Sequence, residues 1–255
     1  MTRRRSVSRA RTARGRIAKS RRTAAFALLC ACFVALVAGV WLFRGWRDYR
    51  PRVERYPLRG IDVSHHQRAI DWTRVAADDV AFAYVKATEG GDYRDDAFAR
   101  NWRGARAAGL AVGAYHFFTF CRPGAEQADN FLATVPVEAD ALPPAVDVEF
   151  GGNCGRVPAP AALRRELEAF LAKIEPAYGK RAVFYVTGDA LDAYGAALPP
   201  RALWRRSLLR EPDPLSQWRL WQYHNRGRVD GIDGAVDLNV FFAGPVAFAR
   251  WREDR

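Results

Sequence analysis

Short apolar runs alternate with stretches of helical composition from residue 60 onward. The apolar runs cover residues 60–67, 82–90, 112–118, 145–150 and 182–186, and helical stretches lie at 97–108, 125–132 and 161–178. This alternation predicts βα units and a parallel sheet. Beyond residue 186 the long helical patterns stop, and three short runs follow at 203–204, 220–223 and 236–241. We therefore expect an α/β fold, a small TIM-type barrel with helical crossovers after the first five of its eight strands.

The strand expected at 145–150 carries two acids. Asp147 and Glu149 interrupt an apolar run that follows Pro143 and Pro144. Because side chains alternate along a strand, both carboxyl groups are expected on one face, about 6.6 Å apart. Neighbouring carboxylates in apolar surroundings repel each other and resist loss of water, which raises the pKa of at least one. Such a pair suits general acid catalysis, and the alternative is a strand end whose acids bind arginine.

Polar residues fall at the ends of the other expected strands, where a TIM barrel carries its active site. They are Asp62, Lys86, Glu89, Tyr115, His116, Gln222 and Asp237. Several of them can also have a purely structural role. Lys86 and Glu89 can form an ion pair at the rim, the end of the barrel where the strands end. His65 and His116 can be hydrogen-bonded core histidines. The aromatic residues nearby can stack on sugar rings or fill the barrel.

The positive charge of the chain is concentrated at its N-terminus. Residues 1–50 contain 13 Lys and Arg and one acid, Asp48, whereas the rest of the chain holds 27 basic and 27 acidic residues. The globular part is therefore formally neutral. The net charge of +12 consequently gives no support for a nucleic-acid partner.

Residues 24–43 contain no charged residue, and a helix of this length spans about 30 Å, the thickness of a bilayer's hydrocarbon core. The preceding basic residues favour a cytoplasmic N-terminus, and Trp41 and Trp46 suit the far interface. We expect a basic cytoplasmic tail at 1–22, a transmembrane signal-anchor at 23–43, a linker at 44–57 and a catalytic barrel outside the cytoplasm at 58–255. The alternative is a secreted protein, released by cleavage near Ala38.

Two of the four cysteines lie in the expected barrel. Cys121 and Cys154 each follow an expected strand, and an oxidising compartment would allow a disulfide between them. Cys30 and Cys32 lie in the apolar segment and act there as small hydrophobic residues. The cysteines and histidines show no metal-ligand spacing. We therefore expect no metal site and no cofactor.

Seven blocks of residues occur in a characteristic order. They are 62–67 (Asp-Val-Ser-His-His-Gln), 70–72 (Ile-Asp-Trp), 85–90 (Val-Lys-Ala-Thr-Glu-Gly), 113–117 (Gly-Ala-Tyr-His-Phe), 147–149 (Asp-Val-Glu), 221–223 (Trp-Gln-Tyr) and 236–239 (Val-Asp-Leu-Asn). Together they resemble glycoside hydrolase family 25, the Chalaropsis-type lysozymes or N-acetylmuramidases. The resemblance implies an irregular (β/α)5β3 barrel. It also implies cleavage of the β-1,4 bond between N-acetylmuramic acid and N-acetylglucosamine in peptidoglycan.

The resemblance makes Glu149 the general acid, with Asp147, Asp62 and Asp237 as acidic companions. We expect Asp147 to raise the pKa of Glu149 and to steer the 2-acetamido group of the substrate, and Asp62 and Asp237 to stabilise positive charge at the anomeric carbon. The expected substrate-binding residues are Tyr84, Lys86, Glu89, Tyr115, Phe117, Trp221, Gln222 and Tyr223. The implied partners are peptidoglycan glycan strands and, through the N-terminal segment, a membrane.

Two other function classes remain open. One is a barrel glycosidase that acts on another N-acetylated glycan such as chitin, and the blocks at 62–67 and 221–223 argue against it. The other is a membrane-anchored glycan-binding protein without catalytic activity. Such a protein would keep the aromatic residues and lose the acids, whereas this chain retains all four.

Overall fold

The computed structural model describes residues 26, 28–46, 49–213 and 217–253, and the chain divides into two compact units at Asp48 and Tyr49. In the first unit, a helix at Leu28–Trp46 is long and apolar enough to cross a membrane. It continues past Phe43, the expected end of the transmembrane segment. The expected basic tail at 1–22 lies outside the described residues.

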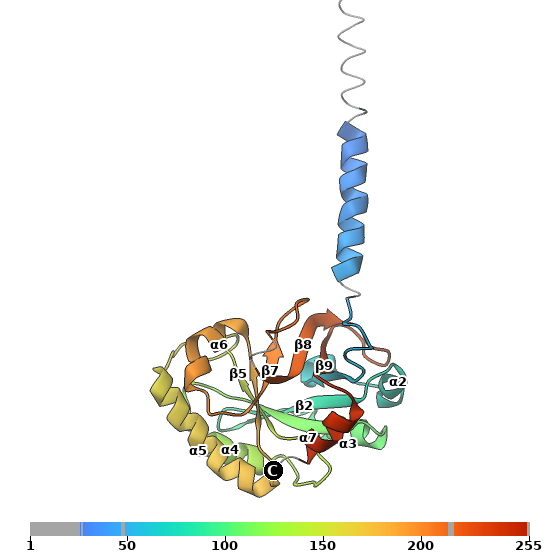
Figure 1. The fold of residues 1–255 in the computed structure, drawn as a ribbon. Coiled ribbons are helices and arrows are strands. Elements are labelled where there is room, and N and C mark those ends of the chain that lie inside the picture. The colour runs from blue at the N-terminus through green and yellow to red at the C-terminus, as the bar shows by residue number, and fades with distance from the viewer. Residues whose placement is uncertain (1–25, 27, 47–48, 214–216, 254–255) are drawn as a thin grey trace, which may run out of the picture. The chain divides into compact units, whose positions relative to one another are not determined.

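In the described part of the second unit, eight strands close into a barrel (Figure 1). They are β1 (Arg59–Val63), β2 (Phe82–Glu89), β4 (Ala111–Phe117), β5 (Ala145–Val148), β6 (Val183–Val186), β7 (Ala202–Arg206), β8 (Trp218–Gly227) and β9 (Val236–Phe241). Neighbouring strands from β1 to β8 pair in parallel, and β9 is antiparallel to both β8 and β1. The two-residue strand β3 (Tyr93–Arg94) pairs with the end of β2. The expected closed barrel of eight strands is confirmed.

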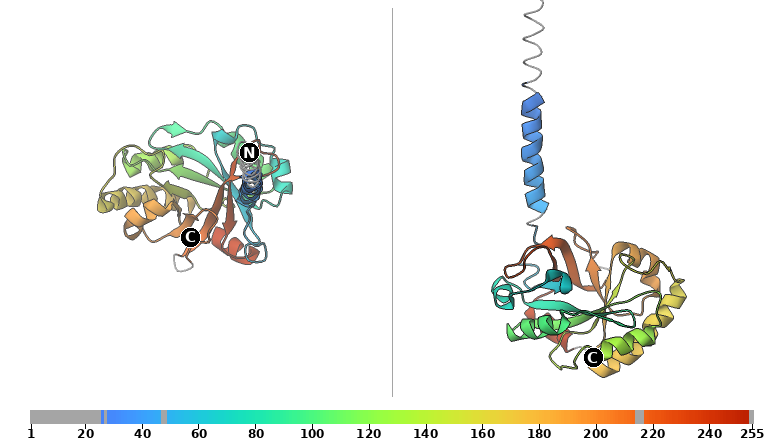
Figure 2. Two further views of the ribbon diagram at one scale, coloured as in Figure 1. Left: turned by 90° about the horizontal axis from the view of Figure 1, so that it is seen from above. Right: turned by 180° about the vertical axis from the view of Figure 1, so that it is seen from behind.

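Helices follow the first five barrel strands. They are η1 (His65–Gln67) and α2 (Trp72–Ala77), α3 (Phe98–Ala107), α4 (Gly124–Leu132), α5 (Pro160–Tyr178), and α6 (Gly188–Tyr194) with η2 (Gly195–Ala197). The described residues between β7 and β9 contain no helix, and α7 (Pro245–Arg252) comes last. Helices α4 and α5 lie side by side outside the strands (Figures 1 and 2). The three long helices were predicted, whereas α2, α6 and α7 are too short to show a clear helical period.

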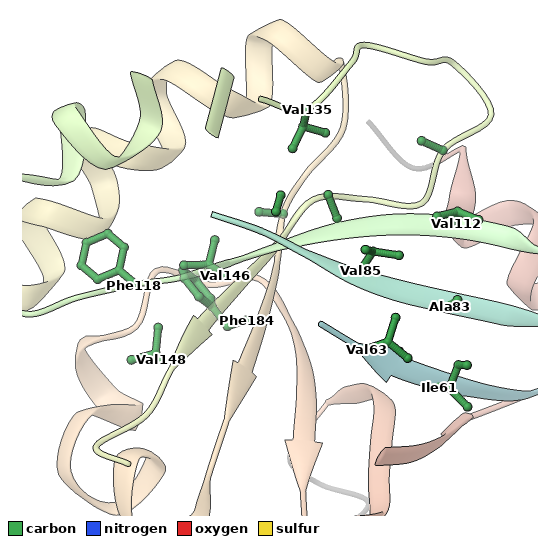
Figure 3. Close-up of a cluster of buried hydrophobic side chains, with 14 of the residues drawn as sticks. Ile61, Val63, Ala83, Val85, Val112, Phe118, Val135, Val146, Val148 and Phe184 are labelled. Carbon is green, nitrogen blue, oxygen red and sulfur yellow. The ribbon is translucent and has the colours of Figure 1, made fainter. Parts of the chain in front are cut away.

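Strand side chains alternate between an outer layer and the barrel interior. Outward-facing residues such as Ile61, Val85 and Val146 pack under the helices, in the cluster that Figure 3 shows. A second buried cluster fills the interior and includes Phe82, Tyr84, Val183, Tyr185, Trp204, Leu220 and Phe241. Glycine makes room for these rings on neighbouring strands. A Cβ added at Gly60 would lie 2.2 Å from the Phe82 ring, and one at Gly113 would lie 2.4 Å from the Tyr84 ring.

The expected linker at 44–57 is partly helical and partly folded onto the barrel. Residues 44–46 belong to the N-terminal helix, and the barrel unit begins at Tyr49. The ring of Tyr56 contacts those of Trp218 and Trp221, at 6.0 and 5.7 Å between centroids. The guanidinium of Arg55 lies 2.7 Å from a carboxylate oxygen of Glu211. The short polar segment is thus held by aromatic contacts that its composition did not predict.

Candidate active site

Four carboxyl groups gather at the rim where the parallel strands end. Asp62 lies near the end of β1, Asp147 near the end of β5, and Glu149 follows β5, which ends at Val148 rather than at residue 150 as expected. Asp237 lies near the beginning of β9. Because β9 runs antiparallel, its first residues reach the same rim, where Asp237 pairs in register with Asp62.

Glu149 is held in partly buried surroundings, with a fifth of its side chain exposed. Burial is the largest cause that raises its pKa, to about 7, and the negative charges of Asp62 and Asp189 add to the rise. The positive charges of Arg206 and Lys86 oppose it. The nearest guanidinium nitrogen of Arg206 lies 4.0 Å from Glu149 Oε2. A large share of Glu149 is therefore protonated at neutral pH, as a general acid requires.

Asp147 is more deeply buried. Burial, followed by the charge of Glu149, raises its pKa well above the ordinary value of 3.8. Its Oδ1 atom is buried and has no hydrogen-bond partner among the described residues. The expected rise in pKa within the pair is confirmed, but its origin differs from the expectation. Burial is the largest cause at both acids, and the repulsion acts mainly on Asp147, whose pKa the charge of Glu149 raises further.

Asp62 and Asp237 form a second pair of carboxyl groups. Burial raises the pKa of Asp62, and hydrogen bonds donated to its Oδ2 by Asn239 (2.7 Å) and Gln222 (3.1 Å) oppose that rise. Burial raises the pKa of Asp237 to about 9, with further contributions from the charge of Asp62 and a hydrogen bond to it. At neutral pH Asp237 therefore keeps its proton, and because its hydrogen bond lowers the pKa of Asp62, Asp62 is the first of the two to ionise.

Several of the residues expected to bind substrate lie at this rim. Lys86 Nζ donates a hydrogen bond to Glu89 Oε2 at 2.7 Å and lies 5.1 Å from the centre of the Phe117 ring. The interpretation of Lys86 and Glu89 as an ion pair is thus confirmed. Tyr115 lies on the inward face of β4, where Asp62 and Asp147 are close enough to raise its pKa further after burial.

Tyr84, Trp221 and Tyr223 are buried away from the rim, so their positions give no support to the expected contact with sugar. Tyr84 is wholly buried in the interior, where its hydroxyl donates to the carbonyl of Pro143 at 3.0 Å. Trp221 and Tyr223 flank the inward-facing Gln222, so strand alternation turns both into the outer core. Gln222 is itself buried, and its amide contacts Asp62 rather than solvent.

The two histidines near the rim have structural partners. His116 is wholly buried, its ring nitrogens lie 2.7 Å from Thr88 Oγ1 and 3.0 Å from Gln127 Oε1, and burial lowers its pKa to about 4. It is a hydrogen-bonded core histidine, which was the structural alternative in the sequence analysis. His65 Nδ1 lies 2.8 Å from Asp95 Oδ2. In the described part of the chain, no group of three or more His, Cys, Asp and Glu could hold a metal ion.

Three residues of the site escaped sequence interpretation. Tyr185 donates to Gln222 Oε1 at 3.0 Å, Asn239 contacts Asp62, and Arg206 faces Glu149. Asn239 lies two positions after Asp237 and so shares its face, a signal that alternation alone could have used. Arg206 lay beyond the apolar run at 203–204, and nothing in its sequence surroundings pointed inward.

The comparisons with known proteins agree with this geometry. A family model described as glycosyl hydrolases family 25 matches residues 61–232. The protein YegX from Escherichia coli (strain K12) is 38% identical over 216 residues, 78% of this chain and 76% of YegX. Lysozyme M1 from Streptomyces globisporus is 35% identical over 202 residues, 72% of this chain and 67% of that protein. The structure of a family 25 glycosyl hydrolase from Bacillus anthracis has a TM-score of 0.75 and 36% identity, covering 80% of this chain and 98% of that one. The chain therefore belongs to glycoside hydrolase family 25.

Proposed function

We propose that this chain is a muramidase, which hydrolyses the β-1,4 bond between N-acetylmuramic acid and N-acetylglucosamine in peptidoglycan, on an irregular (β/α)5β3 barrel. Family membership and the similarity to Lysozyme M1 support the reaction class. The observation that carries the proposal is Glu149, whose pKa of about 7 lets it hold a proton beside the buried Asp147.

In the proposed reaction, Glu149 donates its proton to the glycosidic oxygen as the bond breaks. The C1–O bond electrons go to that oxygen, which leaves as the hydroxyl of the departing sugar, and positive charge develops at the anomeric carbon. The negative charge of Asp62 stabilises that charge. The oxygen of a water molecule then bonds to the anomeric carbon, and the proton that this water loses returns to Glu149. Asp237, protonated and hydrogen-bonded to Asp62, holds this carboxylate in place.

Asp147 has a different proposed part. It lies in β5, two positions before Glu149. Two adjacent carboxyl groups cannot easily lie on opposite faces of a sugar ring, which disfavours a displacement that uses only these two. A buried carboxyl oxygen without a partner costs about 1–3 kcal/mol. We assign Asp147 Oδ1 to the substrate's 2-acetamido group, which it would orient near the anomeric carbon.

Fragment analysis tests the proposed reaction. Purified peptidoglycan is digested with the barrel, the products are reduced with borohydride, and their ends are identified by mass spectrometry. A muramidase leaves reduced N-acetylmuramic acid, whereas reduced N-acetylglucosamine ends would contradict the proposal. Chitin oligosaccharides, digested in parallel, test the alternative glycan substrate, and Glu149→Gln excludes contaminating hydrolases.

We also propose that the helix at Leu28–Trp46 anchors the barrel outside the cytoplasm, with the N-terminus inside. Its length and apolar composition support a membrane span, and the basic residues that precede it in the sequence favour a cytoplasmic N-terminus. A reporter that is active only outside the cytoplasm should work when fused after the C-terminal residue and fail at the N-terminus. Recovery of the barrel in the soluble exported fraction would instead indicate cleavage near Ala38.

A further inference from the structure

The main chain at Glu149 lies beyond the support of the sheet. The pairing of β4 with β5 ends at Phe117 and Asp147, and that of β5 with β6 ends at Val148 and Val186. One further backbone hydrogen bond joins the Phe118 N–H to the Asp147 carbonyl at 2.9 Å. Glu149 therefore needs other contacts if its carboxyl group is to keep one position.

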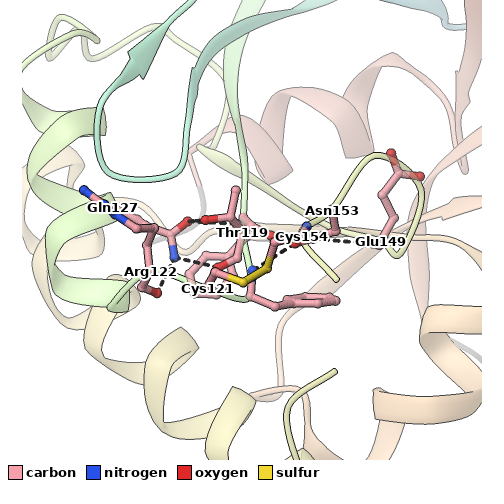
Figure 4. The surroundings of a disulfide bond; sticks show 9 residues. Thr119, Cys121, Arg122, Gln127, Glu149, Asn153 and Cys154 are labelled. Atoms are coloured by element: carbon pink, nitrogen blue, oxygen red, sulfur yellow. Dashed lines mark hydrogen bonds between the residues drawn. A yellow bond between two sulfur atoms is a disulfide. The ribbon is translucent and has the colours of Figure 1, made fainter. Parts of the chain in front are cut away.

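The side chain of Asn153 supplies such contacts (Figure 4). Its Nδ2 donates to the carbonyl of Glu149 at 2.9 Å and to the carbonyl of Phe118 at 3.0 Å. Its Oδ1 accepts from the backbone N–H groups of Phe120 and Cys154, both at 2.9 Å. One amide thus joins the segment after β4 to the segment that carries Glu149.

A disulfide holds Asn153 against that neighbouring segment. Cys154 is bonded to Cys121, which lies in the loop between β4 and α4. This loop is itself tied to α4 by the wholly buried side chain of Gln127, which accepts from the N–H of Thr119 at 2.9 Å. The same amide donates to the carbonyls of Thr119 (3.0 Å) and Arg122 (2.9 Å). The crosslink therefore connects Asn153 to a fixed support.

The residues between Glu149 and Asn153 provide little stiffness of their own. Gly151 and Gly152 are exposed, and Gly152 has a φ of 75°, a left-handed conformation that favours glycine. An unclamped turn of this composition would sample several positions for Glu149. Misplacement of a catalytic group by about 1 Å can cost about 10²-fold in rate.

We propose that Asn153 is a positioning residue for Glu149, and that the Cys121–Cys154 disulfide keeps it in place. The inference rests on the proposed function of Glu149 as general acid. Asn153 touches no reacting atom in this scheme. It acts through the carbonyl of Glu149, and its loss would let the carboxyl group move away from the glycosidic oxygen.

The chain offers a matched control in Asn130. This buried asparagine also bridges loop carbonyls, since its Nδ2 donates to Gly90 at 3.1 Å and to Tyr93 at 2.9 Å, and neither bond joins it to the Glu149 segment. We would measure kcat, KM, the pH profile and Tm for wild type, Asn153→Ala and Asn130→Ala on soluble glycan fragments. Both variants should lose some stability, and only Asn153→Ala should lose kcat, by roughly tenfold to 10²-fold, with KM little changed.

The pH profile distinguishes a displaced Glu149 carboxyl group from a general loss of stability. Because burial is the largest cause of the raised pKa of Glu149, a carboxyl group that drifts toward water should have a lower pKa. The alkaline limb of Asn153→Ala should therefore move to lower pH, and that of Asn130→Ala should stay. Unchanged kcat in folded Asn153→Ala, or an equal loss in Asn130→Ala, would overturn the inference.

A second variant covers the case in which Asn153→Ala does not fold. Cys121→Ser/Cys154→Ser removes the crosslink and leaves every hydrogen bond of Asn153 available. It should also lower kcat, and reduction of the wild type by dithiothreitol should reproduce the loss. Full kcat in both would contradict the role of the disulfide.

Failure of the proposed function is distinguishable from failure of the inference. If wild type releases no fragments from peptidoglycan, the proposed function fails. If wild type is active and the variants match it, only the positioning inference fails.

Discussion

The interior of the barrel and its rim are both built from inward-facing residues of the same strands, but the interior residues are apolar and the rim residues are acidic. Large rings fill the interior, among them Phe82, Tyr84, Trp204 and Phe241. A few residues further along, the inward positions carry Asp62, Asp147 and Asp237. The difference shows that strand alternation selects which residues face the interior, and that the position along the strand decides whether such a residue is a packed ring or a buried acid.

The apolar interior also sets the chemistry of the rim. It excludes water from beneath the acids, and burial is the first cause of the raised pKa at each of the four. Trp204 belongs to both regions. Its ring lies 4.9 Å from that of Tyr84, and its Nε1 donates to Asn239 Oδ1 at 2.8 Å, which in turn holds Asp62. Packing of Trp204 in the interior thus fixes the hydrogen bonds that hold Asp62 at the rim.

The largest expected effect follows from removal of the acid at the rim. Glu149→Gln deletes one ionisable proton and almost no volume, so hydrolysis should fall by at least ~10²–10⁴-fold, the range for general acid catalysis. Thermal unfolding and glycan binding should be preserved. Activity within a few-fold of wild type, measured on the same peptidoglycan preparation, would remove Glu149 from its proposed role.

A change in the interior should instead act on stability. Gly113→Ala places a Cβ 2.4 Å from the Tyr84 ring and 2.9 Å from the Leu142 side chain, and such overpacking typically costs about 1–3 kcal/mol. Denaturant unfolding measures the cost. Gly188→Ala is the control, because nothing lies within 4 Å of a Cβ added there. An unchanged free energy of unfolding in Gly113→Ala would show that the interior is less tightly filled than described.

Arg206 should shift the pH dependence by a smaller amount. Its positive charge lowers the pKa of Glu149, so Arg206→Gln should raise that pKa and keep Glu149 protonated to higher pH. The alkaline limb of kcat/KM should move upward by less than about one pH unit, since a partly exposed pair is worth about 1 kcal/mol or less. Arg205→Gln, which alters the outward-facing neighbour, should leave the limb in place. A limb that moves downward in Arg206→Gln would contradict this electrostatic role.

Asp147→Asn tests whether Asp147 ionises before or after Glu149, and the readout is the alkaline limb of kcat/KM. If Asp147 were ionised when Glu149 titrates, its removal would lower the pKa of Glu149 and shift the limb to lower pH. The structure favours the opposite order, because the charge of Glu149 raises the pKa of Asp147, whereas the main causes of the raised pKa of Glu149 are burial and other charges. We therefore expect a lower kcat with little movement of the limb. A clear shift to lower pH would restore the explanation drawn from sequence.

The smallest expected effect concerns the outer layer. Trp221→Phe removes the hydrogen bond from Nε1 to the Ser207 carbonyl, at 2.7 Å, without touching the rim. Stability should fall by about 1 kcal/mol, and KM for glycan fragments should be unchanged. A raised KM with normal stability would mean that Trp221 contacts substrate after all.

Much of the fold was predictable because periodicity reports burial directly. The runs at 82–90, 112–118 and 182–186 became β2, β4 and β6, and the four acids were found from their place at strand ends. The site partners were harder to predict, since Arg206 and Tyr185 act through contacts between strands distant in sequence. The outer-core positions of Trp221 and Tyr223 were not anticipated because the block around Gln222 was interpreted as one unit, although the two neighbours of Gln222 point to the opposite face.

Direct titration of Glu149 tests most sharply whether the rim holds a general acid at neutral pH. Carbon-13 NMR of side-chain carboxyl groups would be followed from pH 3 to 10 in wild type and in Glu149→Gln. We expect one wild-type signal with a midpoint near pH 7, absent from Glu149→Gln and matching the alkaline limb of kcat/KM. A Glu149 signal that titrates near the ordinary value of 4.5 would contradict its assignment as the acid.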